Sequence, residues 1–141
     1  MAVQFFSADA KAPAFPRTKL KSFIQDLFKN EGEVLDELSY VFCSDEYLLN
    51  INRQFLNHDY YTDIITFDIS ETKREVKGEI YISVDRVKDN AKELKQPIQK
   101  ELLRVIFHGA LHLCGYKDKT ESQQTQMRSK ENYYLQMAGQ Q

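Results

Sequence analysis

Short β-prone segments alternate with amphipathic helical segments along this chain, and their order points to the α+β fold class. Segments rich in β-branched and aromatic residues predict strands at residues 3–6, 38–43, 64–70 and 78–84. Apolar residues at helical spacing predict helices at residues 18–28, 46–56, 85–94, 98–114 and 120–134. The predicted order is β-α-β-α-β-β-α-α-α, which fits a small mixed β-sheet with helices packed on it. The tail from Ala138 to Gln141 is expected to fray.

We expect a single domain over residues 1–141, because the chain has no internal repeat and no linker rich in Gly, Ser or Pro. A hydrophobic content of 42%, with five glycines and three prolines, excludes disordered and collagen-like chains. The two cysteines, Cys43 and Cys114, are too few for a disulfide framework. They indicate a reducing compartment and are interpreted as buried structural thiols.

A cytoplasmic location is expected, because the N-terminal segment lacks a basic region followed by an apolar run. No stretch approaches the roughly 18 apolar residues of a membrane span, so no membrane association is expected. The net charge of −2 argues against indiscriminate nucleic-acid binding, although a local basic patch could still contact a phosphate backbone.

The stretch from residue 107 to residue 120, FHGALHLCGYKDKT, contains the candidate metal ligands. His108 and His112 are four residues apart on a predicted helix, so their rings lie one turn apart on the same face. Gly115 is expected to end this helix, and Asp118 follows three residues later. Two imidazole nitrogens and one carboxylate oxygen leave one position open on a tetrahedral ion, which is typical of a catalytic zinc site.

Residue 109 indicates which kind of hydrolysis to expect. Zinc proteases with a His-Glu-x-x-His motif use the Glu beside the first ligand to activate water. This chain has Gly109 at that position, which accepts no proton. We therefore expect activity to run through the metal-bound water, with a phosphodiester favoured over a peptide as substrate. No general base can be chosen among Asp63, Asp68 and Glu79.

The same stretch resembles the YbeY-type endoribonucleases of bacterial ribosomal RNA maturation. The family signature is His-Gly-x-Leu-His-Leu-x-Gly-Tyr followed by an acidic residue and a third His, and residues 108–116 match each of its fixed positions. Residues 62–67 (TDIITF) and 78–83 (GEIYIS) are similar to two strand segments of the family. The resemblance covers residues from about 40 to 135, and the histidine motif is its specific part.

The resemblance implies an α+β fold with the metal-site helix near the C-terminus. It also implies a single-strand-specific metallo-endoribonuclease that acts on the 3′ end of small-subunit rRNA and in ribosome quality control. The implied cofactor is one Zn²⁺ per chain, or another divalent ion, with His108 and His112 as ligands. The family's third His falls on Asp118, so a harder carboxylate ligand would replace an imidazole. The implied partners are precursor rRNA and the ribosome or its small subunit.

The chain departs from the family at Leu56, where an Arg that would hold phosphate is usual. Lys117 and Lys119, which flank Asp118, are the candidate substrate-binding residues, and Arg53 and His58 are further candidates near Leu56.

Two other functions stay open. One is a metallohydrolase of another class, such as a peptidase, which Gly109 argues against. The other is a ribosome-associated binding module with a structural metal or none, which Leu56 and the unassigned base would favour.

Overall fold

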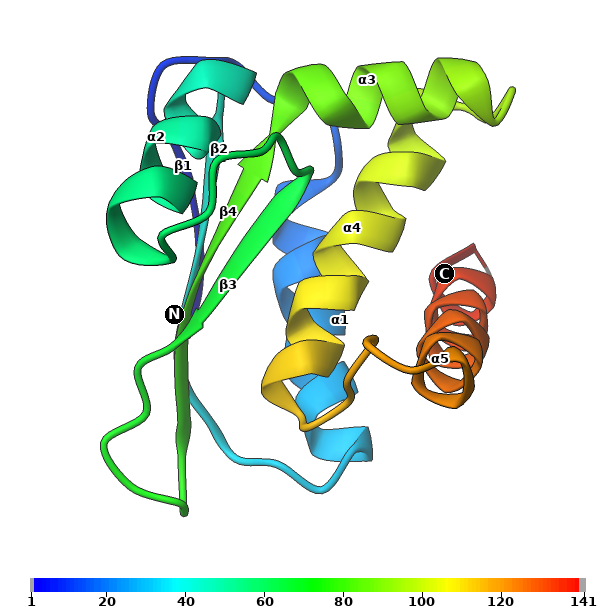
Figure 1. Cartoon of the computed structure of the whole chain (residues 1–141). Helices are drawn as coiled ribbons and strands as arrows, with labels where there is room; N and C mark the ends of the chain where they lie inside the picture. Colours follow the sequence, from blue (N-terminus) through cyan, green and yellow to red (C-terminus); the bar gives the residue numbers. More distant parts are fainter. Residues whose placement is uncertain (1, 140–141) are drawn as a thin grey trace.

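The computed structural model describes residues 2–139, which form one four-stranded sheet and five helices (Figure 1). In chain order, the elements are β1 (Val3–Ser7), α1 (Arg17–Asn30), β2 (Leu35–Cys43), α2 (Asp45–Phe55), β3 (Ile64–Asp68), β4 (Val76–Ser83), α3 (Val84–Glu93), α4 (Ile98–Leu113) and α5 (Glu121–Gly139). This is the predicted order of strands and helices, and the prediction of an α+β fold is confirmed.

Strands β2 and β4 begin earlier than predicted, because Leu35 and Val76 extend the pairing between them. The polar residues that follow interrupt the apolar pattern, yet they pair across the strands, with Lys77 Nζ 3.4 Å from Glu37 Oε2. At the other end of the chain, α5 continues to Gly139. Ala138 is thus helical rather than frayed, since it packs against the core, and residues 140 and 141 lie outside the described residues.

The strand order in the sheet is β1-β2-β4-β3. The first three strands run parallel, and β3 pairs antiparallel with β4 along one edge. Parallel neighbours require crossover connections, and α1 supplies the one between β1 and β2. Strand β3 follows α2 and connects to β4 through a short charged segment. The loop between α2 and β3 crosses an end of the sheet (Figure 1).

Helices α1 and α4 cover one face of the sheet, α5 packs on the outer side of α4, and α2 lies on the opposite face (Figure 1). Alternating residues of the central strands point into the core between the sheet and the helices, as a half-buried strand pattern predicts. The residues that β2 and β4 contribute to this core are apolar or aromatic. They include Leu38, Tyr40, Phe42, Ile80 and Ile82, all fully buried. The Tyr40 hydroxyl donates a hydrogen bond of 2.9 Å to the Ile106 carbonyl of α4.

Gly109 lets α4 lie close against the sheet. A Cβ at this position would be 2.7 Å from Ile80 Cδ1 and 3.0 Å from Ile64 Cδ1, closer than normal packing allows. The glycine thus faces the sheet, and the two histidines on either side of it face away from the core. Position 109, where zinc proteases have their catalytic glutamate, thus also has a structural reason to be glycine: the helix lies too close to the sheet for a side chain.

Both cysteines are free; Cys43 is buried, as expected for a structural thiol, whereas Cys114 is only partly buried. Burial raises the pKa of Cys43 and of Cys114 to about 12, so both stay protonated at neutral pH. Within residues 2–139, no helix combines the length and the apolar character needed to cross a bilayer.

Candidate metal centre

The two histidines of α4 lie one turn apart on the same face of the helix, as their spacing predicts. The ring centroids of His108 and His112 are 5.0 Å apart, and the rings are nearly perpendicular at 77°. Ala110, on the opposite face of this turn, and its neighbour Leu111 are fully buried in the core. Packing of the helix against the sheet therefore orients both imidazoles toward the same external space.

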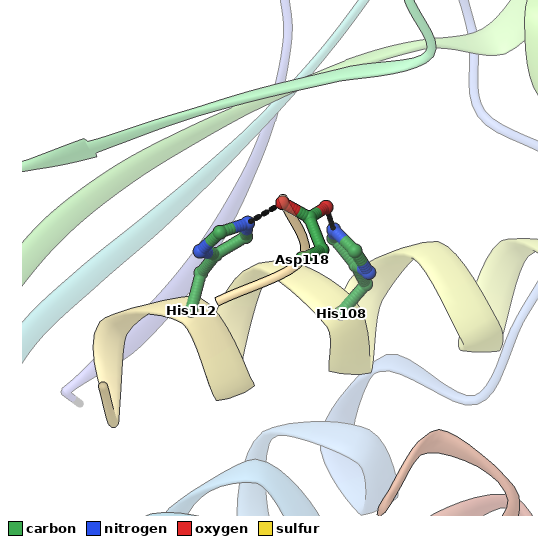
Figure 2. Close-up of side chains that lie close together, drawn as sticks. All are labelled: His108, His112 and Asp118. Carbon is green, nitrogen blue, oxygen red and sulfur yellow. Dashed lines mark ion pairs between the residues drawn. The ribbon is translucent and has the colours of Figure 1, made fainter. Parts of the chain in front are cut away.

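The short loop after α4 brings Asp118 back to these histidines. Gly115 has φ +104°, in the left-handed region that favours glycine, and the Tyr116 amide donates a 3.1 Å hydrogen bond to the Leu111 carbonyl. The reversed chain places the Asp118 carboxylate between the two rings (Figure 2). Its Oδ2 lies 3.2 Å from His108 Nε2, and its Oδ1 lies 3.5 Å from His112 Nε2.

These three side chains fit a zinc-type ion. Each offers one ligand atom, and the three atoms lie within 4.8 Å of one another. Ligand bonds of about 2.0–2.1 Å to a tetrahedral ion place the ligand atoms about 3.3 Å apart. Asp118 approaches the two nitrogens with different oxygens, at 3.2 and 3.5 Å, and each separation is close to that value. The chain therefore supplies three ligands from one helix turn and its following loop.

A buried carboxylate from α5 orients the first histidine. Glu131 is only 4% exposed, and its Oε2 lies 2.7 Å from His108 Nδ1. Its other oxygen accepts a 3.0 Å hydrogen bond from Arg104 of α4. Because the carboxylate accepts the Nδ1 proton, Nε2 is the His108 nitrogen that faces Asp118 and is placed to bind an ion.

The pKa values at the site reflect these contacts. Burial raises the pKa of Glu131, but its hydrogen bond with the positively charged form of His108 and its contact with Arg104 bring the pKa below the usual value. Burial lowers the pKa of His108, and the same carboxylate together with Asp118 brings it above the usual value. Burial and the neighbouring His108 lower the pKa of His112, which favours its neutral, ligand-competent form.

The sequence interpretation did not identify Glu131. The sequence does contain a pattern that points to it. Glu131 follows Met127 by four residues and precedes Tyr134 by three, a helical spacing that places all three on the buried face of α5. An acidic residue on such a face requires a partner in the interior. The sequence could indicate that requirement, but not that the partner is His108.

The three candidate ligands line a cleft of about 1330 Å³. Helices α4 and α5 form one wall of this cleft, and β3, α3 and the loop after α2 form the other. The predicted substrate-contact residues are only partly gathered there. His58, Leu56 and Lys119 line the cleft. Lys117 is exposed and is not among the residues that line it. Arg53 also lies outside, in an exposed ion pair with Asp59 at 2.5 Å.

The three carboxylates that the sequence left as candidate bases are separated by the fold. Asp63 and Asp68 line the metal-site cleft, whereas Glu79 lines a smaller pocket on the side of α2. Asp63 accepts a 3.4 Å hydrogen bond from the Asn90 amide. Burial raises the pKa of Asp63, and the nearby His108 partly offsets this effect.

Comparisons with known proteins identify a family model and relatives that this chain resembles. The family model described as Endoribonuclease YbeY matches residues 6–139. A relative from Cytophaga hutchinsonii named Endoribonuclease YbeY is 50% identical over 131 residues, which cover 93% of this chain and 92% of the relative. One of the same name from Porphyromonas gingivalis is 44% identical over 135 residues, covering 96% and 89%. The solution structure of TM1509 from Thermotoga maritima is 26% identical, with a TM-score of 0.63 over 96% of this chain and 88% of that one.

Proposed function

The chain belongs to the Endoribonuclease YbeY family, and we propose that it is a metal-dependent endoribonuclease that cleaves single-stranded RNA. The observation that carries this proposal is the convergence of His108, His112 and Asp118 at the floor of an open cleft. Family relatives named as endoribonucleases supply the class of substrate.

His108, His112 and Asp118 would hold the ion, and zinc is the ion that their donor atoms suit best. When bound, a zinc-type ion activates a water molecule or polarises an oxygen of the phosphodiester. Glu131 fixes the His108 ring, so that one ligand is oriented before the ion enters.

Among the described residues, seven carboxylates line the cleft, so its three positive side chains are the groups that would contact a phosphate backbone. Arg104, Lys119 and Arg128 line the cleft on the side of α4 and α5. Arg104 also holds Glu131, so its position is fixed, whereas the Arg128 side chain is 60% exposed and lies 3.7 Å from the same carboxylate. A peptide substrate lacks the charges that would use these groups. Gly109, which faces the sheet, offers no carboxylate of the kind that zinc peptidases use.

We further propose a role in maturation of the 3′ end of small-subunit rRNA and in ribosome quality control, with precursor rRNA and the small subunit as partners and the cytoplasm as location. Membership in the YbeY family supports this assignment. In a bacterium that lacks its own family member, expression of this chain should restore mature 3′ ends of small-subunit rRNA. The His112→Ala variant should not. Normal 3′ ends with the variant would contradict the role in maturation.

The activity itself is tested on untagged protein purified without chelator. Elemental analysis should find about one zinc-type ion per chain. His112→Ala should lose the ion, whereas Asp26→Asn, an exposed change on α1, should keep it. The loaded protein should cut a labelled single strand faster than the duplex of the same sequence. A loaded protein that leaves both intact would contradict the nuclease and favour the ribosome-associated binding module.

A further inference from the structure

The loop between α2 and β3 presents a pair of stacked aromatic rings to the cleft that contains the candidate metal ligands. The rings of His58 and Tyr60 have centroids 5.2 Å apart and are inclined by 22°. The Tyr60 hydroxyl lies 3.0 Å from His58 Nδ1. Both residues line the same cleft as His108 and Asp118, and Tyr60 is 56% exposed. The pair therefore offers an open ring surface on the wall opposite α4 and α5.

A buried side chain, rather than burial of the rings themselves, holds this pair in place. Asn52 of α2 is only 1% exposed, and its side-chain amide donates a 2.8 Å hydrogen bond to the Tyr60 carbonyl. Its backbone carbonyl accepts a 3.1 Å hydrogen bond from the His58 amide. Asn57, directly before His58 in the chain, has φ 55° and reverses the backbone. One buried residue thus fixes the backbone of both ring-bearing positions, so binding costs little further ordering of the loop.

The two walls of the cleft differ in the chemistry that they offer. The wall at the loop supplies aromatic and apolar surface from Leu56, His58 and Tyr60. The wall at α4 and α5 supplies the guanidinium groups of Arg104 and Arg128, which share the carboxylate of Glu131. A nucleic-acid strand carries matching groups, with flat bases on one side of the backbone and phosphates along it. Aromatic side chains on which bases stack, with positive groups that contact the backbone, are how proteins bind single strands without strong sequence preference.

We propose that the His58–Tyr60 pair is a stacking subsite for a nucleobase of the RNA strand held in the cleft. The inference rests on the proposed nuclease function and specifies how its substrate is recognised. A base inside a duplex has both faces covered by its neighbours, so only an unpaired base can place a face on this pair without an unstacking cost. The subsite therefore selects unpaired nucleotides at the metal centre.

The test measures binding of metal-loaded protein to an uncleavable 2′-O-methyl single strand by fluorescence anisotropy. A second strand of equal length carries abasic spacers, which keep the phosphates and remove the bases. Replacement of Tyr60 by Ala should weaken binding of the base-bearing strand about 10-fold to 100-fold, the range expected for loss of one stacked base. Binding of the abasic strand should not change. Tyr60→Phe, which keeps the ring, should stay within about 2-fold of the wild type for both strands.

The matched control is Tyr133→Ala, because Tyr133 is a 51% exposed tyrosine of α5 that is not among the residues lining the cleft. This variant should bind both strands as the wild type does. An unchanged affinity of Tyr60→Ala for the base-bearing strand would overturn the proposal. So would an equal loss for both strands, since the residue would then act on the backbone or on the loop.

The result also separates this inference from the nuclease assignment. RNA cleavage by a wild type whose base binding does not depend on Tyr60 overturns the stacking subsite alone. Binding that depends on Tyr60, without cleavage, overturns the nuclease alone. A loaded wild type that neither binds nor cleaves the single strand overturns both.

Discussion

Glu131 Oε2 lies 2.7 Å from His108 Nδ1, although the two residues belong to different helices and are 23 positions apart in the chain. The contact is shielded from water, because α5 packs its buried stripe directly against α4. It orients the His108 ring with Nε2 toward Asp118, as second-layer carboxylates do at many metal sites.

This contact predicts that Glu131→Gln binds zinc about 10-fold to 100-fold more weakly while still folding. A neutral amide can accept the Nδ1 proton but supplies no charge to support the ligand, and it also weakens the contact with Arg104. Competition with a chromophoric chelator measures the affinity. Glu71→Gln, an exposed change in the connection between β3 and β4, serves as control. Equal zinc affinity in both variants would contradict the orienting role.

Asp118 is predicted to be replaceable by another ligand but not by an inert side chain. Asp118→His should keep the ion, because an imidazole can reach the space between His108 and His112 and zinc accepts nitrogen readily. Asp118→Ala should weaken binding strongly, since only two ligands remain. Metal content after dialysis, measured by elemental analysis, checks both. A metal-free Asp118→His together with a fully loaded Asp118→Ala would show that position 118 is not a ligand position.

Glu31 is predicted to make the stability of the protein depend on pH. It follows α1, and its carboxylate accepts hydrogen bonds from the hydroxyls of Tyr116 and Tyr134 and from Lys130 of α5. Burial raises the pKa of Glu31, but these three donors outweigh burial and bring the pKa below its usual value. A carboxylate with a lowered folded-state pKa stabilises the fold above its unfolded-state pKa. That contribution disappears as pH falls through the folded-state pKa.

Glu31→Gln should therefore reduce the free energy of unfolding at pH 7 by about 1–3 kcal/mol, a range typical of hydrogen bonds to a charged group. The difference from the wild type should shrink as the pH is lowered below the usual pKa of a glutamate. Urea unfolding at a series of pH values tests this. Glu33→Gln is the matched control. A difference that stays constant down to acid pH would show that packing, and not charge, explains the effect.

The close approach of α4 to the sheet predicts that Gly109→Ala destabilises the protein by about 1–3 kcal/mol through overpacking. The new methyl group would lie 2.7 Å from Ile80 Cδ1. Ile80→Val removes that atom, so the double variant should lose less stability than the sum of the two single changes. Gly139→Ala meets no atom within 4 Å and serves as control. Thermal unfolding of the four variants measures the coupling, and strict additivity would contradict the proposed contact.

The elements and the ligand cluster could be predicted because their signals are local. Period-two and helical patterns decide which face of each strand and helix is apolar. The spacing of His108 and His112 alone places both rings on one face, and Gly115 explains how Asp118 can return to them within a few residues. Each of these relationships is contained within one element or one loop, where backbone geometry dictates which side chains can meet.

Contacts between elements were decided only by the tertiary structure. The sequence offered Asp63, Asp68 and Glu79 as equivalent carboxylates, and the fold placed only the first two in the cleft. It likewise joined Glu131 to His108 and fixed the backbone of Tyr60 through the buried amide of Asn52. These pairings depend on how α4, α5 and the loop after α2 pack around the sheet. That packing is a sum of many long-range contacts, to which no single local pattern in the sequence corresponds.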